Sequence, residues 1–356
     1  MAVPETGQEG SERVAAALTA LAAGGSIVLL DEAQGRGYFV CAADRGGEEF
    51  VAHATEHGRG VLKVAMMPAH LQQLAIPVLM GADCHVPVDL VGCERPGVAA
   101  DRIATLRTLV DPALDGDRLV TPGHVFPTAA GDCHTIDDAC VSRVMLEAAR
   151  LAGCAPVAAF CEAVDERAPA GTPERPARLA ALARRLGLES VSVRAVMIHR
   201  ELVESAVERV VEAALPTAEG PLAAVGYVGR RSEQEYVAFV AGTEAATVRV
   251  HIHRRCQVSD VFGGARCGCG EHLREALDEV HAAGDGVLIY YGSQTDGFCA
   301  RDEGTGPAAW PFTTEIAAML RDLGVDDAAV SSNGPLSPAD LAALGVDVTM
   351  RARPET

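Results

Sequence analysis

The sequence is poor in aromatic and basic side chains. Aromatic residues make up 4% of the 356 residues, with a single Trp, so the cores must be built chiefly from Val, Leu and Ala. Lys and Arg number 30 against 49 Asp and Glu, which gives a formal net charge of −19. A chain this acidic repels phosphate backbones, which argues against nucleic-acid binding but allows a small anionic ligand in a local basic pocket.

Long apolar runs are also missing. No stretch approaches the 18 consecutive apolar residues of a transmembrane helix, so we expect no membrane contact. The N-terminal MAVPETGQEGSERVAAAL lacks the basic region and apolar core of a secretory signal. Both features favour a cytoplasmic location, where the eleven cysteines would be reduced thiols or metal ligands. Four of them lie in apolar runs and are expected to be packing residues: Cys41, Cys93, Cys154 and Cys161.

Length and hydrophobic pattern predict two domains, each of mixed α and β structure in the α+β class. The sequence shows neither an internal repeat nor a long low-complexity tract. Apolar runs and alternation predict strands, and helical spacing with terminal caps predicts helices. The strands are expected at residues 25–30, 37–43, 247–253 and 286–292, and the helices at 141–154, 270–284 and 337–345, the last capped by Ser337.

One further helix is expected near the boundary between the domains. HRELVESAVERVVEAAL, residues 199–215, has apolar residues at Leu202, Ala206, Val210 and Ala213, which is helical spacing. It runs into PTAEGP, the clearest break in the chain. We assign the domains to residues 1–205 and 206–356.

Three cysteines stand close together in RRCQVSDVFGGARCGCGEHL. Cys256 ends a predicted strand, and Cys267 and Cys269 open a predicted helix, whose N-terminus lowers thiol pKa values. Three thiolates repel one another unless a cation holds them, and zinc is the usual cation. Three protein ligands with an open position would indicate a catalytic zinc. The alternatives are unrelated buried thiols, or a structural zinc whose fourth ligand is His251, His253 or His272.

Catalysis at such a site would need help from other side chains. Three thiolates leave a bound zinc with a net charge near −1, so its Lewis acidity is lower than that of a three-histidine site. Asp296, Asp302 and Glu303 could serve as an acid or base, although a solvated acidic loop is the commoner role for such residues. Asp296 is the candidate catalytic residue. The candidate substrate-binding residues, which could hold one phosphate or carboxylate, are Arg254, Arg255 and Arg266.

Motifs in the two halves of the chain resemble two known families. VHIHRRCQVSDVFGGARCGCGEHL is similar to the zinc segment of GTP cyclohydrolase II, matching it at the three cysteines and at Asp260, Phe262, Gly263 and Arg266. The first half resembles 3,4-dihydroxy-2-butanone-4-phosphate synthase in HGRGVLKVAM, AADRIATLRTLVDP, TPGHVFP, LEAARLAG and AFCEAV. The resemblance spans nearly the whole chain, in the order of the fused bifunctional riboflavin-biosynthesis proteins. It implies a synthase-like domain, then a cyclohydrolase-like domain with one zinc on the three cysteines, in a homodimer.

The first half departs from the synthase pattern at its magnesium ligands. The family's acidic loop after the first strand is shortened here to DEAQGRG, with Arg36 near the position of the key Glu. The family's second ligand, a His, falls on Val141, while His124 and Glu162 survive. His134 could be a displaced ligand or an exposed loop residue. We therefore expect that the magnesium site, and with it the synthase activity, is lost.

The second half departs at its GTP contacts. GSQTDGFC replaces the segment that holds guanine and triphosphate in the cyclohydrolases, with Asp296 where they have an arginine. A second segment has Pro311 near the family's Arg and Thr313 at its Tyr, and SNGPL lacks the family's lysine. A triphosphate needs several cationic or backbone donors, so GTP is not expected to be the substrate.

The three cysteines are retained while the family's magnesium and GTP contacts are lost, and three hypotheses follow from this difference. The first is a repurposed zinc-dependent hydrolase or cyclohydrolase that acts on a small molecule other than GTP, one that could carry a single negative charge. The second is a zinc-stabilised pseudoenzyme with a binding or regulatory role. The third is an active but divergent enzyme of riboflavin biosynthesis.

Overall fold

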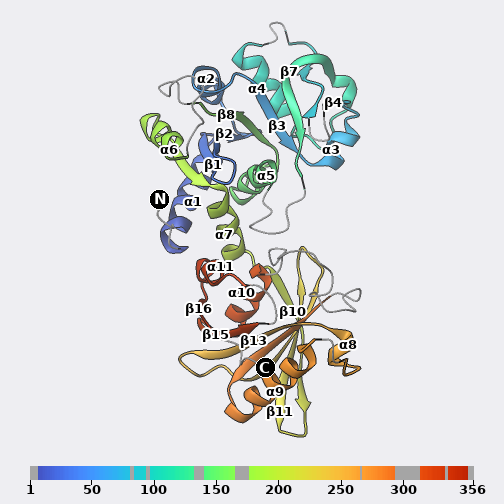
Figure 1. Ribbon diagram of the computed structural model, residues 1–356. Helices are drawn as coiled ribbons and strands as arrows, with labels where there is room; N and C mark the ends of the chain where they lie inside the picture. Colours follow the sequence, from blue (N-terminus) through green and yellow to red (C-terminus); the bar gives the residue numbers. More distant parts are fainter. Residues whose placement is uncertain are drawn as a thin grey trace. The chain divides into compact units, whose positions relative to one another are not determined.

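The chain forms two compact units, Met1–Arg200 and Glu201–Thr356, each built around its own sheet (Figure 1). The computed structural model describes residues 7–80, 84–93, 97–131, 140–164, 176–264, 267–292, 313–332 and 336–351. Both units mix helices with a sheet, which confirms the predicted class. No helix in these described ranges is long and apolar enough to cross a membrane.

The first unit is a sheet with helices on both faces. Its strands run in the order β4-β5-β7-β3-β8-β2-β1-β9, and β6 also pairs with β7. The strands are β1 (Ile27–Asp31), β2 (Arg36–Ala42), β3 (Leu62–Met66), β4 (Val78–Met80), β5 (Cys84–His85), β6 (Val88–Leu90), β7 (Leu119–Ala129), β8 (Ala158–Glu162) and β9 (Glu189–Ser192). The helices are α1 (Gly7–Ala22), α2 (Glu48–Glu56), α3 (Pro68–Gln73), α4 (Ala99–Thr108), a 3₁₀ turn (Gly116–Arg118), α5 (Val141–Leu151), α6 (Pro176–Arg185) and α7 (Val193–Val203).

Alternation along the central strands divides the core of this unit into two layers. In β1, Val28 and Leu30 pack in one layer and Ile27 and Leu29 in the other, because successive side chains of a strand point to opposite faces. The first layer is completed by α2, α4 and α6, and the second by α1, α5 and α7. Three of the four expected packing thiols are buried, Cys41, Cys154 and Cys161, whereas Cys93 is partly exposed.

The second unit is a mixed sheet in the order β10-β11-β12-β14-β13-β15-β16. Its antiparallel part comprises β10 (Val207–Pro216), β11 (Pro221–Gly229) and β12 (Glu235–Gly242), and β12 also pairs antiparallel with β14. Its parallel part comprises β13 (Val248–Arg254), β14 (Gly286–Tyr291), β15 (Asp327–Ser332) and β16 (Asp347–Met350). The helices are α8 (Gln257–Asp260), α9 (Cys269–Ala283), α10 (Thr313–Asp322) and α11 (Pro338–Ala343).

Most of the predicted elements are present, including the capped helix α11. The Ser337 hydroxyl accepts a hydrogen bond from the Asp340 backbone N–H at 3.3 Å. Helix α9 ends as predicted at Gly284, whose left-handed φ of 63° stops the helix. The sequence thus marks its helix ends with the residues that local chemistry requires.

The helix predicted at residues 199–215 is wrong. Helix α7 ends at Val203, and Val207–Pro216 is the edge strand β10. Its valines are β-branched and suit an extended backbone, and β11 supplies the hydrogen bonds that a sequence pattern does not reveal. PTAEGP is therefore the turn of the β10–β11 hairpin inside the second unit and not a domain boundary.

Candidate metal centre

The three clustered cysteines meet where β13 ends and α9 begins. Cys256 lies between β13 and α8, Cys269 is the first residue of α9, and Cys267 lies two residues earlier. Their Sγ atoms all lie within 4.8 Å of one another, with 3.6 Å between Cys256 and Cys267. Cys256 is buried and the other two thiols are partly exposed. Among the described residues, no other group of His, Cys, Asp or Glu forms such a cluster of three or more.

The segment between the first and second cysteine is held against α9 by Ser259. The Ser259 hydroxyl accepts a hydrogen bond from the Gly270 N–H at 2.9 Å and donates one to the Cys267 carbonyl at 3.4 Å. A Cβ atom at Gly270 would lie 2.5 Å from the Ser259 carbonyl oxygen, so only glycine fits this approach. These contacts fix α8, which follows Cys256, against the start of α9, which carries Cys269.

The cluster favours a thiolate at Cys267. Burial alone would raise the pKa of this thiol, but hydrogen bonds from the Cys269 backbone and from the Cys256, Cys269 and Ser259 side chains together lower its pKa to about 7. A thiolate is the form that binds metal. Three sulfur donors of this kind suit zinc better than magnesium or calcium.

A buried carboxylate, Asp260, supports the first cysteine. It accepts hydrogen bonds from the Cys256 N–H at 2.8 Å and from the Tyr290 hydroxyl at 3.2 Å, and both its oxygens lie 3.2 Å from His253 Nε2. Its side chain is 2% exposed. Burial raises the pKa of Asp260, but these hydrogen bonds outweigh burial and hold it below its usual value. Asp260 is therefore an ionised anchor for the residues around the thiols.

Aromatic rings stack beside this carboxylate. The His253 ring lies 5.6 Å from the Tyr290 ring with an interplanar angle of 6°, and 5.6 Å from the His272 ring with an angle of 17°. His253 and Tyr290 are neighbours because β13 and β14 pair in parallel register at these two residues. The arrangement puts donors and acceptors near the cluster, where they could hold a proton or a polar ligand atom.

The candidate fourth ligands were His251, His253 and His272. In the described part of the chain, none of them belongs to the group of ligand atoms that lie within 4.8 Å of one another. His253 is turned toward Asp260, and its Nδ1 lies 3.3 Å from His272 Nδ1. His251 Nδ1 is 2.6 Å from the Ser331 hydroxyl. Burial lowers the pKa of His251 to about 4. Its Nε2 lies 3.4 Å from a Glu279 oxygen, without the geometry of a hydrogen bond. Among the described residues, the cluster therefore contains the three cysteines and none of these histidines.

The predicted polar residues are only partly within the described chain. Arg254 ends β13, and Arg255 follows it and donates its backbone N–H to the Tyr291 carbonyl at 2.7 Å; both side chains are partly exposed at the strand end that carries Cys256. The remaining candidates lie outside the described residues: Arg266, Asp296, Asp302, Glu303, Pro311 and His134.

In the first unit, the shortened acidic loop is a closed hairpin turn. Asp31 pairs with Arg36 across β1 and β2, and the Asp31 carboxylate accepts the Gln34 N–H at 3.1 Å. Val141 begins α5, where it offers no metal-binding atom. Glu162 forms an ion pair with Arg59 at 3.2 Å. The described part of this unit thus contains no cluster of three or more metal-binding side chains.

The surviving His124 belongs to a pair that the sequence did not reveal. Its Nδ1 lies 2.7 Å from Asp89 Oδ2, and its backbone N–H donates to Asp89 Oδ1 at 3.0 Å. The Asp89 side chain is buried, while the His124 ring is about half exposed. The two residues are 35 positions apart and meet because β6 pairs with β7, a contact without a local sequence signal.

Comparison with known proteins identifies the class to which this two-unit arrangement belongs. The family model for 3,4-dihydroxy-2-butanone 4-phosphate synthase matches residues 15–199, and the model for GTP cyclohydrolase II matches residues 208–353. Two relatives are each named "Riboflavin biosynthesis protein RibBA". The Cytophaga hutchinsonii protein is 27% identical over 380 residues, covering 95% of this chain and 91% of the relative. The Bacillus cytotoxicus protein is 29% identical over 346 residues, covering 94% and 83%.

A solved structure has the same two-domain fold. The crystal structure of RibBX, described as a two-domain 3,4-dihydroxy-2-butanone 4-phosphate synthase from A. baumannii, has a TM-score of 0.68 and 23% identity. The match covers 96% of this chain and all of that one. The chain belongs to the 3,4-dihydroxy-2-butanone 4-phosphate synthase family, in the form fused to a GTP cyclohydrolase II domain.

Proposed function

We propose that this chain is a divergent member of its family, whose second unit is a zinc-dependent hydrolase or cyclohydrolase acting on a small molecule other than GTP. The observation that carries the proposal is the set of three converging thiols without a fourth ligand from the described residues. A zinc ion held by three protein ligands keeps a position for water or substrate. In this proposal the open position serves catalysis and not a purely structural role.

The residues around the thiols have separate tasks in this proposal. Cys256, Cys267 and Cys269 would hold the zinc, which when bound supplies Lewis acidity toward a coordinated oxygen. Asp260 fixes the Cys256 backbone and orients His253. His253, with Asp260 on Nε2 and the partly exposed His272 on Nδ1, can exchange a proton with either neighbour.

The charge around the site argues against GTP as the substrate. Gly292, Asp296, Pro311 and Leu336 stand at positions where the cyclohydrolases place several triphosphate contacts. The loss of three such contacts would cost about 4 kcal/mol, or roughly a thousandfold in affinity. Arg254 and Arg255, with Arg266, suit one phosphate or carboxylate, so the substrate we infer carries a single negative charge.

The first unit, in this proposal, has lost its magnesium site and the synthase reaction. Its closed Asp31–Arg36 turn replaces the acidic loop of the synthases, and Val141 cannot replace a histidine. Magnesium binds oxygen ligands and usually needs carboxylates to hold it. The homodimeric state implied by the resemblance stays a prediction, which sedimentation analysis of the full chain can check.

Zinc analysis followed by turnover assays tests the proposed function. We expect about one zinc per purified chain, no micromolar GTP binding by calorimetry, and no steady release of formate from GTP. Tight GTP binding or formate release would contradict the proposal and restore ordinary riboflavin biosynthesis. Zinc whose fourth ligand, in a metal-bound structure, is a protein side chain would instead favour the pseudoenzyme.

A further inference from the structure

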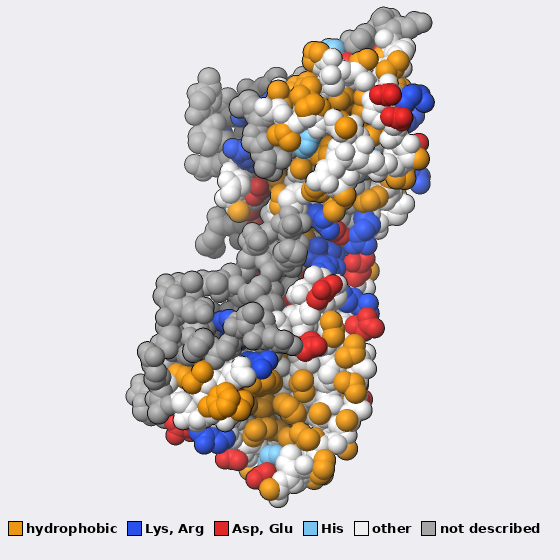
Figure 2. Space-filling model, turned by 90° about the vertical axis from the view of Figure 1, so that its right-hand side faces the viewer, with side chains coloured by type: hydrophobic (Ala, Val, Ile, Leu, Met, Phe, Trp, Pro, Cys, Tyr) orange, Lys and Arg blue, Asp and Glu red, His pale blue; other side chains and the backbone are white. Residues whose placement is uncertain are grey.

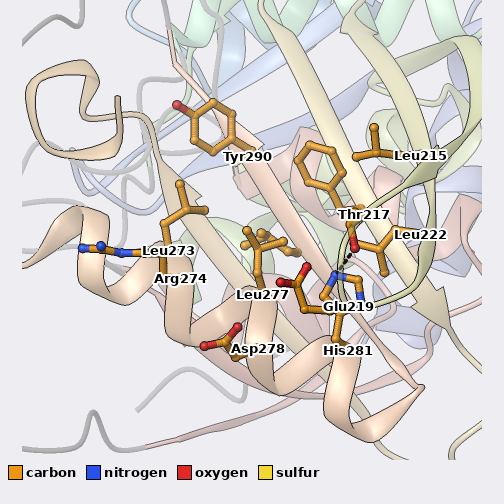
Figure 3. A pocket seen from close by; sticks show the side chains of 12 residues that line it. Leu215, Thr217, Glu219, Leu222, Leu273, Arg274, Leu277, Asp278, His281 and Tyr290 are labelled. Carbon is orange, nitrogen blue, oxygen red and sulfur yellow. Dashed lines mark hydrogen bonds between the residues drawn. The ribbon is translucent and has the colours of Figure 1, made fainter. Parts of the chain in front are cut away.

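A second site in the C-terminal unit is a pocket of about 430 Å³ between α9 and the β10–β11 hairpin (Figure 3). Such a volume is typical of pockets that bind small molecules. Its wall is formed mainly by apolar side chains: Leu215, Leu222, Phe239, Leu277, Leu288 and Tyr290.

The pocket exists because one sheet face is only partly covered. Leu215 pairs with Leu222 across β10 and β11, and Phe239 pairs with Leu288 across β12 and β14, so these side chains share faces of the sheet by register. Helix α9 contacts β12, β13 and β14, whereas nearly all of the edge strand β10 is exposed, Leu215 to 39%. Figure 2 shows hydrophobic side chains gathered on the surface of this unit. A ligand that covers this apolar surface removes it from water, and this burial favours binding.

The polar groups that line the pocket are two carboxylates, one guanidinium and a Thr–His pair. Glu219 in the hairpin turn and Asp278 on α9 are exposed carboxylates, and neither is paired with a residue in the described ranges. The Thr217 hydroxyl and His281 Nε2 are hydrogen-bonded to one another at 3.2 Å. Arg274 donates from Nε to the Gly270 carbonyl at 2.9 Å, and its side chain extends away from Leu277 in Figure 3, whereas that of Glu219 extends toward it.

We infer that this pocket binds a small molecule with an apolar body and a protonated amine. The body lies among the leucines beside Phe239, and the ammonium group lies near Glu219, whose carboxylate extends toward Leu277. A carboxylate in place of the ammonium would meet the like charge of Glu219 on a chain with a net charge of −19. The charge at the pocket therefore selects a cation, in contrast to the arginines at the strand end beside Cys256.

One residue connects this pocket with the thiol cluster. The Tyr290 side chain lines the pocket, and its hydroxyl donates to Asp260, which in turn accepts the Cys256 N–H. A ligand in the pocket contacts Tyr290 directly, without occupying the position next to the thiols. The second site is thus separate from the proposed zinc site, and it can bind its ligand whether or not the proposed reaction occurs.

Calorimetry with two probes of equal chain length tests the inference. Octylammonium and octanoate, each below its micelle-forming concentration, are titrated into the full chain at low ionic strength. We expect saturable one-to-one binding of octylammonium that is about fivefold tighter than that of octanoate, a preference that falls as salt is added. Glu219→Gln should narrow this preference, whereas the matched control Glu244→Gln, which alters an exposed carboxylate outside the pocket lining, should leave it unchanged.

A second variant tests the apolar wall. Leu277→Trp places a larger side chain in the pocket from a partly exposed helix position, so it should abolish octylammonium binding while the thermal unfolding midpoint is retained. Equal binding of both probes would overturn the assignment of a cationic ligand. The absence of saturable binding would overturn the pocket as a ligand site. A dimer that Leu215→Glu dissociates, with no binding of either probe, would show that a second copy of the chain covers this face.

Discussion

Replacing Asp260 with Asn should weaken both the fold of the C-terminal unit and the zinc binding that we propose for it. Asp260 accepts hydrogen bonds from Cys256 and Tyr290 and faces His253 with both oxygens, and its side chain is 2% exposed. Asn keeps one acceptor oxygen but loses the charge. Its amide NH₂ group, a donor, would take the place of the second oxygen, which faces another donor, His253 Nε2. Hydrogen bonds to charged groups contribute about 1.5–3 kcal/mol each. We expect Asp260→Asn to lower the free energy of unfolding by about 2 kcal/mol, since part of the network survives.

The effect on metal binding follows from the same contacts. Residues that support metal ligands typically change metal affinity by about 10–100-fold when they are replaced. Urea unfolding followed by circular dichroism would measure the stability, and competition with a chromophoric chelator would measure the zinc affinity. Asp347→Asn, which alters an exposed carboxylate on β16, is the matched control and should change neither. An Asp260→Asn chain with unchanged stability and zinc affinity would refute the role given to this network.

The pH dependence of this variant has a defined sign. The pKa of Asp260 is held below its usual value of 3.8, so its stabilisation is fully present above pH 3.8 and is lost as the pH falls through the lower folded-state pKa. The difference in stability between the parent and Asp260→Asn should therefore be constant near neutral pH and shrink only in strong acid.

Three further predictions address other residues. Cys267→Ser should reduce the zinc content well below one per chain, and full retention of zinc in this variant would contradict the ligand assignment. Burial lowers the pKa of His251 from 6.5 to about 4, so between these pH values the unfolded chain binds a proton that the folded chain does not. The free energy of unfolding should therefore fall as the pH drops from 6.5 toward 4. His251→Gln should flatten that slope when unfolding is measured across this pH range. The first unit should not convert ribulose 5-phosphate to the butanone phosphate even with excess magnesium, and robust formate release in that assay would show that its metal ligands survive elsewhere in the chain.

Local chemistry in the sequence predicted much of the fold. Helix ends were predictable where a single residue determines them, as with Ser337 at the start of α11 and Gly284 after α9. Strict alternation predicted β13, and the apolar run 286–292 predicted β14. The spacing of Cys256, Cys267 and Cys269 with respect to these elements, and their similarity to a known zinc segment, predicted a cluster that the structure brings within 4.8 Å.

Long-range pairing decided what the sequence could not. Residues 207–216 carry helical spacing, but the hydrogen bonds of β11 make them a strand, and this hairpin forms one side of the apolar pocket. Asp89 meets His124, and Tyr290 meets His253, only because strand register places them together. The sequence by itself determined the ancestry, the class and the thiol cluster, since these depend on local spacing. The carboxylate network and the second pocket depend on contacts between segments far apart in the chain, which only the tertiary structure specifies.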